Sequence, residues 1–433
     1  MKEQTEKGKI GEKFANEIAY KSFLKYWCYP NPKDENGDKK EICDLLIIFK
    51  DTIIIFCVKN CDFKDDYKRY FRKTIEKDIN QINGAERKLT NKTEIYIKHP
   101  DRPTEKINKS KIKRVFRVVV HLAEAVQFYP FSGISKEGKF IHVFDKETFS
   151  TIVSELDTIP DFIEYLEKKS LVFNNSDVLI LPKDEYDFDE ATAKQFFDYT
   201  SNRNNEKKQI LISGSECDLL ATYLRNEHQF PDLLSSDEYD ALSLQLDGAW
   251  NEFTTHKQVL LKKNENKVSY FIDELVAREV LTNIDNKMGD KIAQELLSFN
   301  RLARRSLAKS FFDFFDKYQN CYGNMVARRF SGDVDGVGVT FFFYPSEMDE
   351  ENVNTLIELA MDSFYVYNGY KIEKMIVIAT TNKMKQFKFA LDENLTPFDT
   401  QTEEAIMEDA KKLGWFSNLQ SISFHESEFP EVD

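Results

Sequence analysis

The fold of the N-terminal region is decided by the stretch Glu41-Ile42-Cys43-Asp44-Leu45-Leu46-Ile47-Ile48-Phe49-Lys50-Asp51-Thr52-Ile53-Ile54-Ile55-Phe56-Cys57-Val58-Lys59. Two apolar runs flank Lys50-Asp51, a pattern typical of two buried strands joined by a tight turn. Asp44 opens the first run and Lys59 ends the second. An antiparallel pairing therefore places both residues at the same edge of the sheet. Cys57 shares the sheet face of Lys59 because side chains repeat every second residue.

Helical and strand patterns surround this hairpin. Residues 8–26 have apolar side chains at helical spacing, so we expect an amphipathic first helix that ends before Pro30. A long charged helix is expected at about residues 65–89. Further strands complete a mixed sheet, and a helical stretch interrupted by Pro160 follows it. The strands are expected at residues 93–98, 114–122 and 140–144, and the helical stretch at residues 146–168.

The chain has 433 residues, which is too long for one ordinary core and predicts two or three domains. We expect an α/β protein with three parts. Residues 1–170 form a mixed sheet flanked by helices, residues 171–320 form a mainly helical middle domain, and residues 321–433 form a smaller α/β domain. In the last part we expect a glycine-rich turn, four strands and two helices. Their expected ranges are 331–338 for the turn, 337–344, 374–380, 386–391 and 421–425 for the strands, and 352–367 and 403–413 for the helices.

Composition narrows the class of protein. The formal net charge is −14, but residues 1–120 hold 28 Lys and Arg against 19 Asp and Glu. The basic end is therefore the expected polyanion face. The acidic remainder fits protein contacts, self-inhibition by DNA mimicry or simple solubility equally well, and a protein partner or self-association through the middle and C-terminal domains is possible. No apolar run is long enough to span a membrane and no signal peptide is recognisable, so we expect a cytoplasmic protein with no membrane partner.

Neither the six cysteines nor the six histidines have the spacing of a zinc site, and the cysteines are expected to be reduced thiols.

Asp44 and Lys59 are the residue types that phosphodiester hydrolysis requires. Carboxylates hold Mg²⁺, which neutralises charge on the phosphate and activates water, and a lysine beside the ion stabilises the developing charge. A third ligand is expected from the first helix. Glu12 and Glu17 both lie at the border of its apolar face, so periodicity alone does not choose between them.

These residues resemble the PD-(D/E)XK nuclease superfamily, which has the restriction-endonuclease-like fold. The resemblance rests on Gly11-Glu12 with Phe14-Ala15, on Asp44-Leu45-Leu46-Ile47, and on Phe56-Cys57-Val58-Lys59. Gln81, in a later helix, is similar to the helical glutamine of Mrr-like and RecB-like members. The resemblance covers about the first 90 to 120 residues. It implies catalytic roles for Glu12, Asp44, Lys59 and Gln81, and a Mg²⁺ or Mn²⁺ cofactor.

Cys57 departs from the superfamily pattern, because it stands where the acid of the ExK triplet is expected. A thiol is a poor ligand for the hard Mg²⁺ ion. Either Glu12 and the backbone carbonyl of Val58 complete a metal site with Asp44, or the site is weakened or inactive. Cys57 itself is expected to be a buried strand residue and not a nucleophile.

Three basic clusters are candidates for contact with a nucleic-acid backbone. A solvated surface is the ordinary alternative for each of them. The clusters are Lys68-Arg69 with Arg72-Lys73, then Lys109, Lys111, Lys113, Arg114 and Arg117, and finally Arg301 with Arg304-Arg305.

Two hypotheses follow. The first is a metal-dependent endonuclease or exonuclease acting on DNA, or less readily on RNA; by analogy alone it resembles effectors of prokaryotic antiviral defence. The second is a non-catalytic nucleic-acid-binding or protein-assembly component that retains the nuclease fold.

Overall fold

The computed structural model describes residues 10–11, 13–14, 17, 25–91, 94–123, 126–181, 190–200, 207–284, 286–320, 327–334, 336–417 and 426–431. The chain is a mixed α/β protein, as expected. It divides into two compact units, Met1–His256 and Lys257–Asp433. The expected domain boundaries near residues 170 and 320 do not coincide with this division.

A six-stranded mixed sheet forms the centre of the first unit, in the order β1-β2-β3-β6-β8-β7. The predicted hairpin is confirmed. β2 and β3 are antiparallel, and Lys50 takes a left-handed conformation (φ 51°) in the turn between them. β3, β6 and β8 are mutually parallel, so their carboxyl ends meet at one edge. The strands are β1 (Cys28–Pro30), β2 (Leu45–Phe49), β3 (Thr52–Lys59), β6 (Arg114–His121), β7 (Ser132–Ile134) and β8 (Phe140–Asp145).

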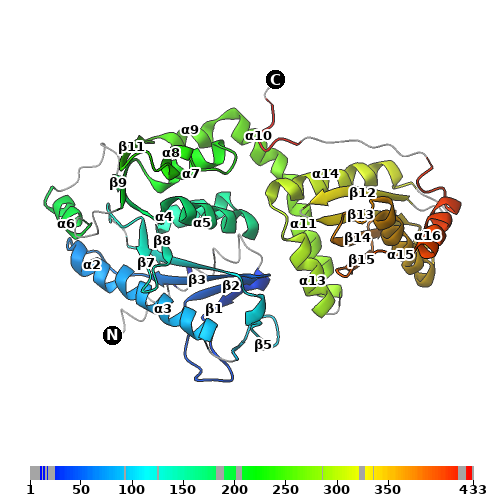
Figure 1. The fold of residues 1–433 in the computed structure, drawn as a ribbon, viewed down its shortest axis with the longest axis horizontal. Helices are drawn as coiled ribbons and strands as arrows, with labels where there is room; N and C mark the ends of the chain where they lie inside the picture. The colour runs from blue at the N-terminus through cyan, green and yellow to red at the C-terminus, as the bar shows by residue number, and fades with distance from the viewer. Residues whose placement is uncertain are drawn as a thin grey trace. The chain divides into compact units, whose positions relative to one another are not determined.

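Helices cover both faces of this sheet (Figure 1). On one face, α2 and α3 pack against Ile53, Ile55 and Cys57 of β3. On the other, α4 and α5 bring Phe149 and Phe162 onto the ring of Phe56, at 5.9 and 6.4 Å between centroids. Burial on both sides explains the near-continuous apolar sequence of β3. The helices are α2 (Tyr67–Lys73), α3 (Ile75–Asn91), α4 (Lys146–Glu155) and α5 (Ile159–Phe173).

Two details differ from the expected helices and strands, and one agrees. The single helix expected at residues 65–89 is broken at Thr74, whose buried hydroxyl donates to the carbonyl of Tyr70. The strand expected at residues 93–98 is reduced to β4 (Tyr96–Ile97), which pairs with β5 (Glu105–Lys106) outside the main sheet. The interruption at Pro160 is confirmed, since α5 begins there after Thr158 caps it.

The rest of the first unit is a three-stranded parallel sheet in the order β11-β10-β9. It corrects the expectation that residues 171–320 are one mainly helical domain, because residues up to His256 belong to the first unit. The elements are β9 (Ser176–Leu181), α6 (Glu190–Thr200), β10 (Lys208–Ser213), α7 (Glu216–Arg225), α8 (Asp232–Ser235), β11 (Ala241–Gln245) and α9 (Ala249–Thr255).

The second unit begins with helices and continues into a four-stranded sheet in the order β12-β13-β14-β15. The glycine-rich segment expected to be a turn is only partly one: residues 331–334 end β12, Gly336 lies in a turn, and residues 337–338 begin β13. The strand expected at residues 421–425 lies outside the described residues. The elements are α10 (Lys257–Glu265), α11 (Tyr270–Leu275), α12 (Leu281–Asn283), α13 (Asn286–Leu296), α14 (Arg301–Tyr318), β12 (Ala327–Val334), β13 (Val337–Tyr344), α15 (Glu350–Tyr367), β14 (Lys374–Thr381), β15 (Phe387–Asp392) and α16 (Thr400–Lys412).

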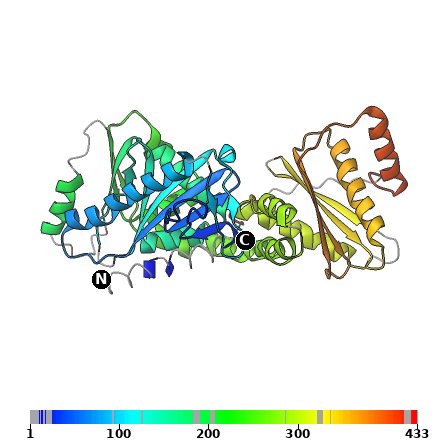
Figure 2. The ribbon, with the colours of Figure 1, turned by 90° about the horizontal axis from the view of Figure 1, so that it is seen from below.

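Strand β13 is buried on both faces in this unit. Figure 2 shows α15 and α16 on one side of the sheet and α14 on the other. Phe311 and Phe314 of α14 lie against Phe341 and Phe343 of β13, at 5.1 Å and 4.7 Å between ring centroids respectively. The dense phenylalanine segment of α14 is therefore core and not a free surface.

The second unit repeats the connectivity of the first. In both, an antiparallel hairpin leads into helix and then into a strand parallel to the second hairpin strand, β3 with β6 and β13 with β14. β13 ends with Tyr344, whereas β3 ends with Lys59. The repeat therefore does not carry the acid and lysine pair.

Candidate active site at the end of strand β3

Asp44 is held against the end of β3 by backbone hydrogen bonds. Its Oδ2 accepts a hydrogen bond from the backbone N–H of Val58 at 2.6 Å, and its own N–H donates to the carbonyl of Phe56 at 3.2 Å. The residue is only 8% exposed. The predicted meeting of Asp44 and Lys59 at one sheet edge follows from this hairpin register.

The ammonium of Lys59 lies between two carboxylates. Its Nζ is 3.2 Å from Oδ1 of Asp78 and 3.9 Å from Oδ2 of Asp44. Burial by itself would lower the pKa of Lys59. The negative charges of Asp78 and, to a smaller extent, Asp44 favour the protonated ammonium, and the net result is a pKa above the usual value. The side chain therefore carries a full positive charge at neutral pH.

Asp78 is the site residue that the sequence prediction missed. It comes from α3, its side chain is fully buried, and neither carboxylate oxygen accepts a hydrogen bond from the described residues. The main compensating group is the Lys59 ammonium, 3.2 Å from Oδ1, and the charge of Lys77 contributes less. Burial raises the pKa of Asp78 to about 7, against the attraction of Lys59, and the charge of Asp44 adds to the increase.

A signal for Asp78 was present in the sequence. Asp78 lies three residues after Ile75 and four before Ile82, so it interrupts the apolar stripe that packs α3 onto the sheet. A carboxylate in such a stripe is seldom buried without a partner. This position could therefore have been singled out as a second acid.

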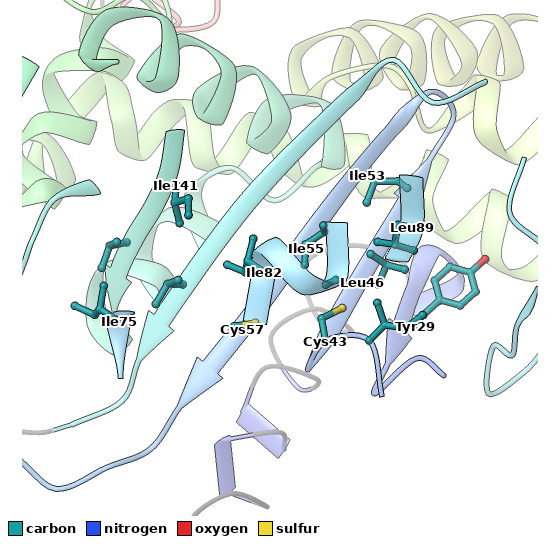
Figure 3. Packing of buried hydrophobic residues seen from close by; sticks show 14 of the residues in the cluster. Tyr29, Cys43, Leu46, Ile53, Ile55, Cys57, Ile75, Ile82, Leu89 and Ile141 are labelled. Atoms are coloured by element: carbon teal, nitrogen blue, oxygen red, sulfur yellow. The ribbon is translucent and has the colours of Figure 1, made fainter. Parts of the chain in front are cut away.

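Cys57 occupies the sheet face expected for it, beneath α3 and beside Ile82 (Figure 3). The thiol is completely buried. Burial, followed by the charges of Asp78 and Asp44, raises the pKa of Cys57 well above its usual value. Cys57 is thus a protonated thiol in this state.

The other site residues predicted from the sequence are Glu12, with Glu17 as its alternative, Val58 and Gln81. Glu12 lies outside the described residues. Glu17 is exposed and 3.6 Å from Lys13, in the manner of a surface helix pair. The backbone N–H of Val58 holds Asp44, so Val58 lies at the site. Gln81 is exposed on α3, one turn after Asp78.

Two further polar residues lie beside Lys59 at the carboxyl ends of the neighbouring parallel strands. His121 of β6 is the register partner of Lys59, and Asp145 of β8 is the partner of His121. The Nδ1 of His121 lies 3.3 Å from the hydroxyl of Tyr70, and burial lowers the pKa of His121 to about 3. His121 is therefore neutral. Of the three residues Lys59, His121 and Asp145 at these strand ends, Lys59 carries the positive charge.

The basic cluster on α2 forms one cationic face. Lys68, Arg69, Arg72 and Lys73 are all exposed, and in the described part of the chain none of them pairs with a carboxylate. Their spacing places them on the side of the helix opposite to buried Tyr70 and its neighbours. This face is available to a polyanion.

The cluster with Lys111, Lys113 and Arg114 lies elsewhere. Arg114 pairs in register with Thr52, at the opposite end of β3 from Lys59. Seven residues of strand separate the two ends, which corresponds to about 23 Å. Arg114 also forms ion pairs with Asp51 at 3.1 Å and Glu167 at 3.6 Å. This cluster therefore lies at the opposite end of β3 from Lys59, and its contact with a nucleic-acid backbone stays a prediction.

The arginines of α14 are structural. Arg301 and Arg304 are buried and form ion pairs with Asp273, at 2.8 Å and 2.6 Å respectively. Arg305 is fully buried and pairs with Glu426 at 2.8 Å. These side chains are not exposed to a nucleic acid.

Another group of possible metal ligands lies on and beside α5. Asp161, Glu164 and His228 have ligand atoms within 4.8 Å of one another, and they are the one such trio found among the described residues. Lys168 also contacts Glu164 and donates to the carbonyl of His228. Lys168 therefore already compensates the charge of Glu164.

Comparison with known proteins finds no matching family model, no similar curated protein and no similar solved structure. Within the described residues, no helix has the length and apolar character needed to span a bilayer. Among the described residues, the charged side chains around Lys59 are the feature that bears most directly on function.

Proposed function

We propose that the first unit is a metal-dependent phosphodiesterase that cleaves nucleic acid, with DNA as the first candidate substrate and RNA as the second. The observation that carries the proposal is the position of Lys59 between Asp44 and Asp78, at 3.9 and 3.2 Å, at the carboxyl ends of parallel strands. In open α/β sheets, this edge is where ligands bind.

Asp44 and Asp78 are the residues that would hold Mg²⁺ or Mn²⁺. Asp78 fits this role because it is a buried carboxylate whose two oxygens accept no hydrogen bond within the described residues. A dication would compensate its burial far better than one ammonium does. When bound, the ion would neutralise phosphate charge and activate water. Asp78 thus takes the place of the acid that Cys57 does not provide.

Lys59 and α2 supply the binding of the polyanion. The Lys59 ammonium is charged, and it can move from the carboxylates to a phosphate oxygen when a metal ion takes its place. The four unpaired cations of α2 follow the β3 strand end in sequence and present a contiguous positive face. They would hold the backbone of the substrate without reading its sequence.

A non-catalytic binding protein is the second candidate. It is favoured by the ion pairs themselves, because Lys59 already compensates Asp78 in part, and buried charged trios also occur as purely structural elements. In this alternative the α2 face would bind nucleic acid and no bond would be cleaved. A role in antiviral defence would be compatible with both candidates and rests on analogy alone.

The test is a cleavage assay on circular DNA, linear DNA and RNA, with Mg²⁺, Mn²⁺ or EDTA. The variants are Asp44→Asn, Asp78→Asn and Lys59→Met, with Glu76→Gln as the matched control, since Glu76 lies on the same helix but is half-exposed. We expect metal-dependent cleavage in the wild type and Glu76→Gln, and none in the other three. Equal cleavage in all five proteins would indicate a contaminant. Binding without cleavage in the wild type would favour the second candidate.

A further inference from the structure

Residues 426–431, which we call the acidic segment, lie against α10 and α14 within the second unit (Figure 1). The contact joins parts of the chain that are remote in sequence, since Ser306 and Glu426 are 120 residues apart. All six residues of the segment are half-buried or exposed, and none belongs to the buried core. Polar contacts are therefore the main attachment of the segment.

Arg305 of α14 is the centre of this attachment. Its side chain is fully buried, and three of its four partners among the described residues come from the acidic segment. The guanidinium pairs with the Glu426 carboxylate at 2.8 Å and donates to the backbone carbonyls of Ser427 and Glu428. The fourth partner is the side chain of Asn266, at 3.1 Å. A buried arginine is unfavourable without a counter-ion, so this pocket favours an acidic occupant.

The carboxylate of Glu426 is bound by two further side chains of α14. The hydroxyl of Ser306 donates to its Oε2 at 2.7 Å, and the ammonium of Lys309 donates to its Oε1 at 2.6 Å. The Glu426 side chain is only 17% exposed as a result. This position of the segment is therefore specific for an acid, because a neutral side chain would lose the ion pairs with Arg305 and Lys309.

Lys262 of α10 binds the next part of the segment. Its ammonium pairs with the Glu428 carboxylate and lies 4.9 Å from the ring centroid of Phe429. Recognition thus combines two acids separated by one residue with an aromatic ring after the second acid. The carbonyl contacts of Arg305 add affinity that does not depend on the side chains of the segment.

The neighbouring arginines of α14 have a carboxylate partner among the helices of the second unit. Arg301 and Arg304 both pair with Asp273 of α11. The charge of Arg305, by contrast, is compensated by Glu426, which lies on a segment outside the core. The segment can therefore leave this surface without unpacking a helix.

We propose that this surface of α10 and α14 is a binding site for acidic peptides of the pattern Glu-x-Glu-Phe, and that residues 426–431 occupy it as an intramolecular competitor. The inference concerns the second unit and does not rest on the proposed function. A peptide of the same chemistry can replace the segment, because ion pairs and charged hydrogen bonds form equally well with a separate chain. The effective concentration of a tethered segment is high, so an added peptide gains access when the segment is weakened.

The test measures binding of a fluorescein-labelled peptide with the sequence of residues 426–433 to the full chain, by fluorescence anisotropy. The proteins are the wild type, the double variant Glu426→Gln with Glu428→Gln, and the double variant with either Lys309→Glu or Lys317→Glu added. Lys317 is an exposed lysine two turns further along α14, so its variant is a control with the same change of charge.

We expect the double variant to bind the peptide at least about 10-fold more tightly than the wild type, because its competitor is weakened. Adding Lys309→Glu should abolish this gain, whereas adding Lys317→Glu should keep most of it. A peptide with glutamine at both glutamate positions should bind none of the proteins detectably. Higher salt should weaken the binding of the acidic peptide.

The inference is overturned if the peptide binds the wild type and the double variant equally, or if the glutamine peptide binds as well as the acidic one. Equal losses from Lys309→Glu and Lys317→Glu would indicate attraction by net charge alone and would also overturn it. If the double variant does not fold, Glu428→Gln alone removes one ion pair and should give a smaller gain of the same sign. No gain in that variant overturns the inference as well.

Discussion

Asp78 of α3 lies 3.2 Å from the Lys59 ammonium at the end of β3, and this ion pair brings a second acid to the place where the strand itself offers only Cys57. Asp44, which immediately precedes β2, completes the arrangement at 3.9 Å. Three elements thus converge at one sheet edge, and each contributes one charged side chain.

The first prediction concerns the pH dependence of stability. The pKa of Asp78 is raised to about 7 in the folded protein, so between pH 4 and 7 the folded state holds a proton that the unfolded state has released. The Asp78 contribution to the free energy of unfolding therefore falls as pH rises through this window, by up to about 1.4 kcal/mol per pH unit. Above pH 7 it stays at its low value.

Urea unfolding of the wild type and Asp78→Asn, without metal at several pH values, measures this contribution as a difference. We expect the gap between the two proteins to shift in favour of the variant as pH rises from about 5 to 7. A difference that is constant across this range would contradict a raised pKa for Asp78.

The second prediction distinguishes the two basic clusters. Lys68→Glu with Arg72→Glu should weaken binding to DNA and reduce the slope of log affinity against log salt by about 2, because two phosphate contacts are lost. Lys111→Glu with Lys113→Glu changes the charge by the same amount at the other end of the sheet, and should leave the slope nearly unchanged. Equal effects from both double variants would argue for non-specific attraction by net charge.

The third prediction concerns the buried ion pair between Glu86 of α3 and Arg117 of β6. Arg117 Nε donates to Glu86 Oε2 at 2.5 Å, and Lys139 lies 2.7 Å from the same carboxylate. Glu86→Gln leaves the arginine charge buried without its counter-ion and should cost about 3–5 kcal/mol. Lys139→Ala removes a side chain that is 44% exposed and should cost less than about 1 kcal/mol. Denaturant unfolding compares the two, and similar small losses would refute the buried-pair argument.

The fourth prediction tests the core of the second unit. Phe311→Ala removes a completely buried ring that packs on Phe341, and should destabilise this unit by about 3–5 kcal/mol. Phe315→Ala, at a half-buried position of the same helix, should cost less. Calorimetry measures both variants. Retention of first-unit cleavage in Phe311→Ala, below its unfolding transition, is expected if the two compact units are stable independently.

Local patterns in the sequence predicted much of this architecture. The hairpin, the break at Pro160 and most elements of the second unit follow from apolar periodicity and turn residues, which act over a few positions. The three-stranded sheet of β9, β10 and β11 was not predicted as a sheet, because short apolar runs do not show which of them pair. The repeated connectivity of the two units was also invisible in sequence.

The sequence by itself determined that Asp44 and Lys59 meet, because an antiparallel hairpin with a two-residue turn allows only one register for its two ends. Only the tertiary structure decided which further acid and which cations join them. The rotation of α3 about its axis, set by packing on β3, turns Asp78 toward Lys59. The parallel pairing of β6 with β3 carries Arg114 to the far end of the sheet. Both depend on contacts between residues distant in the chain, which no local pattern encodes.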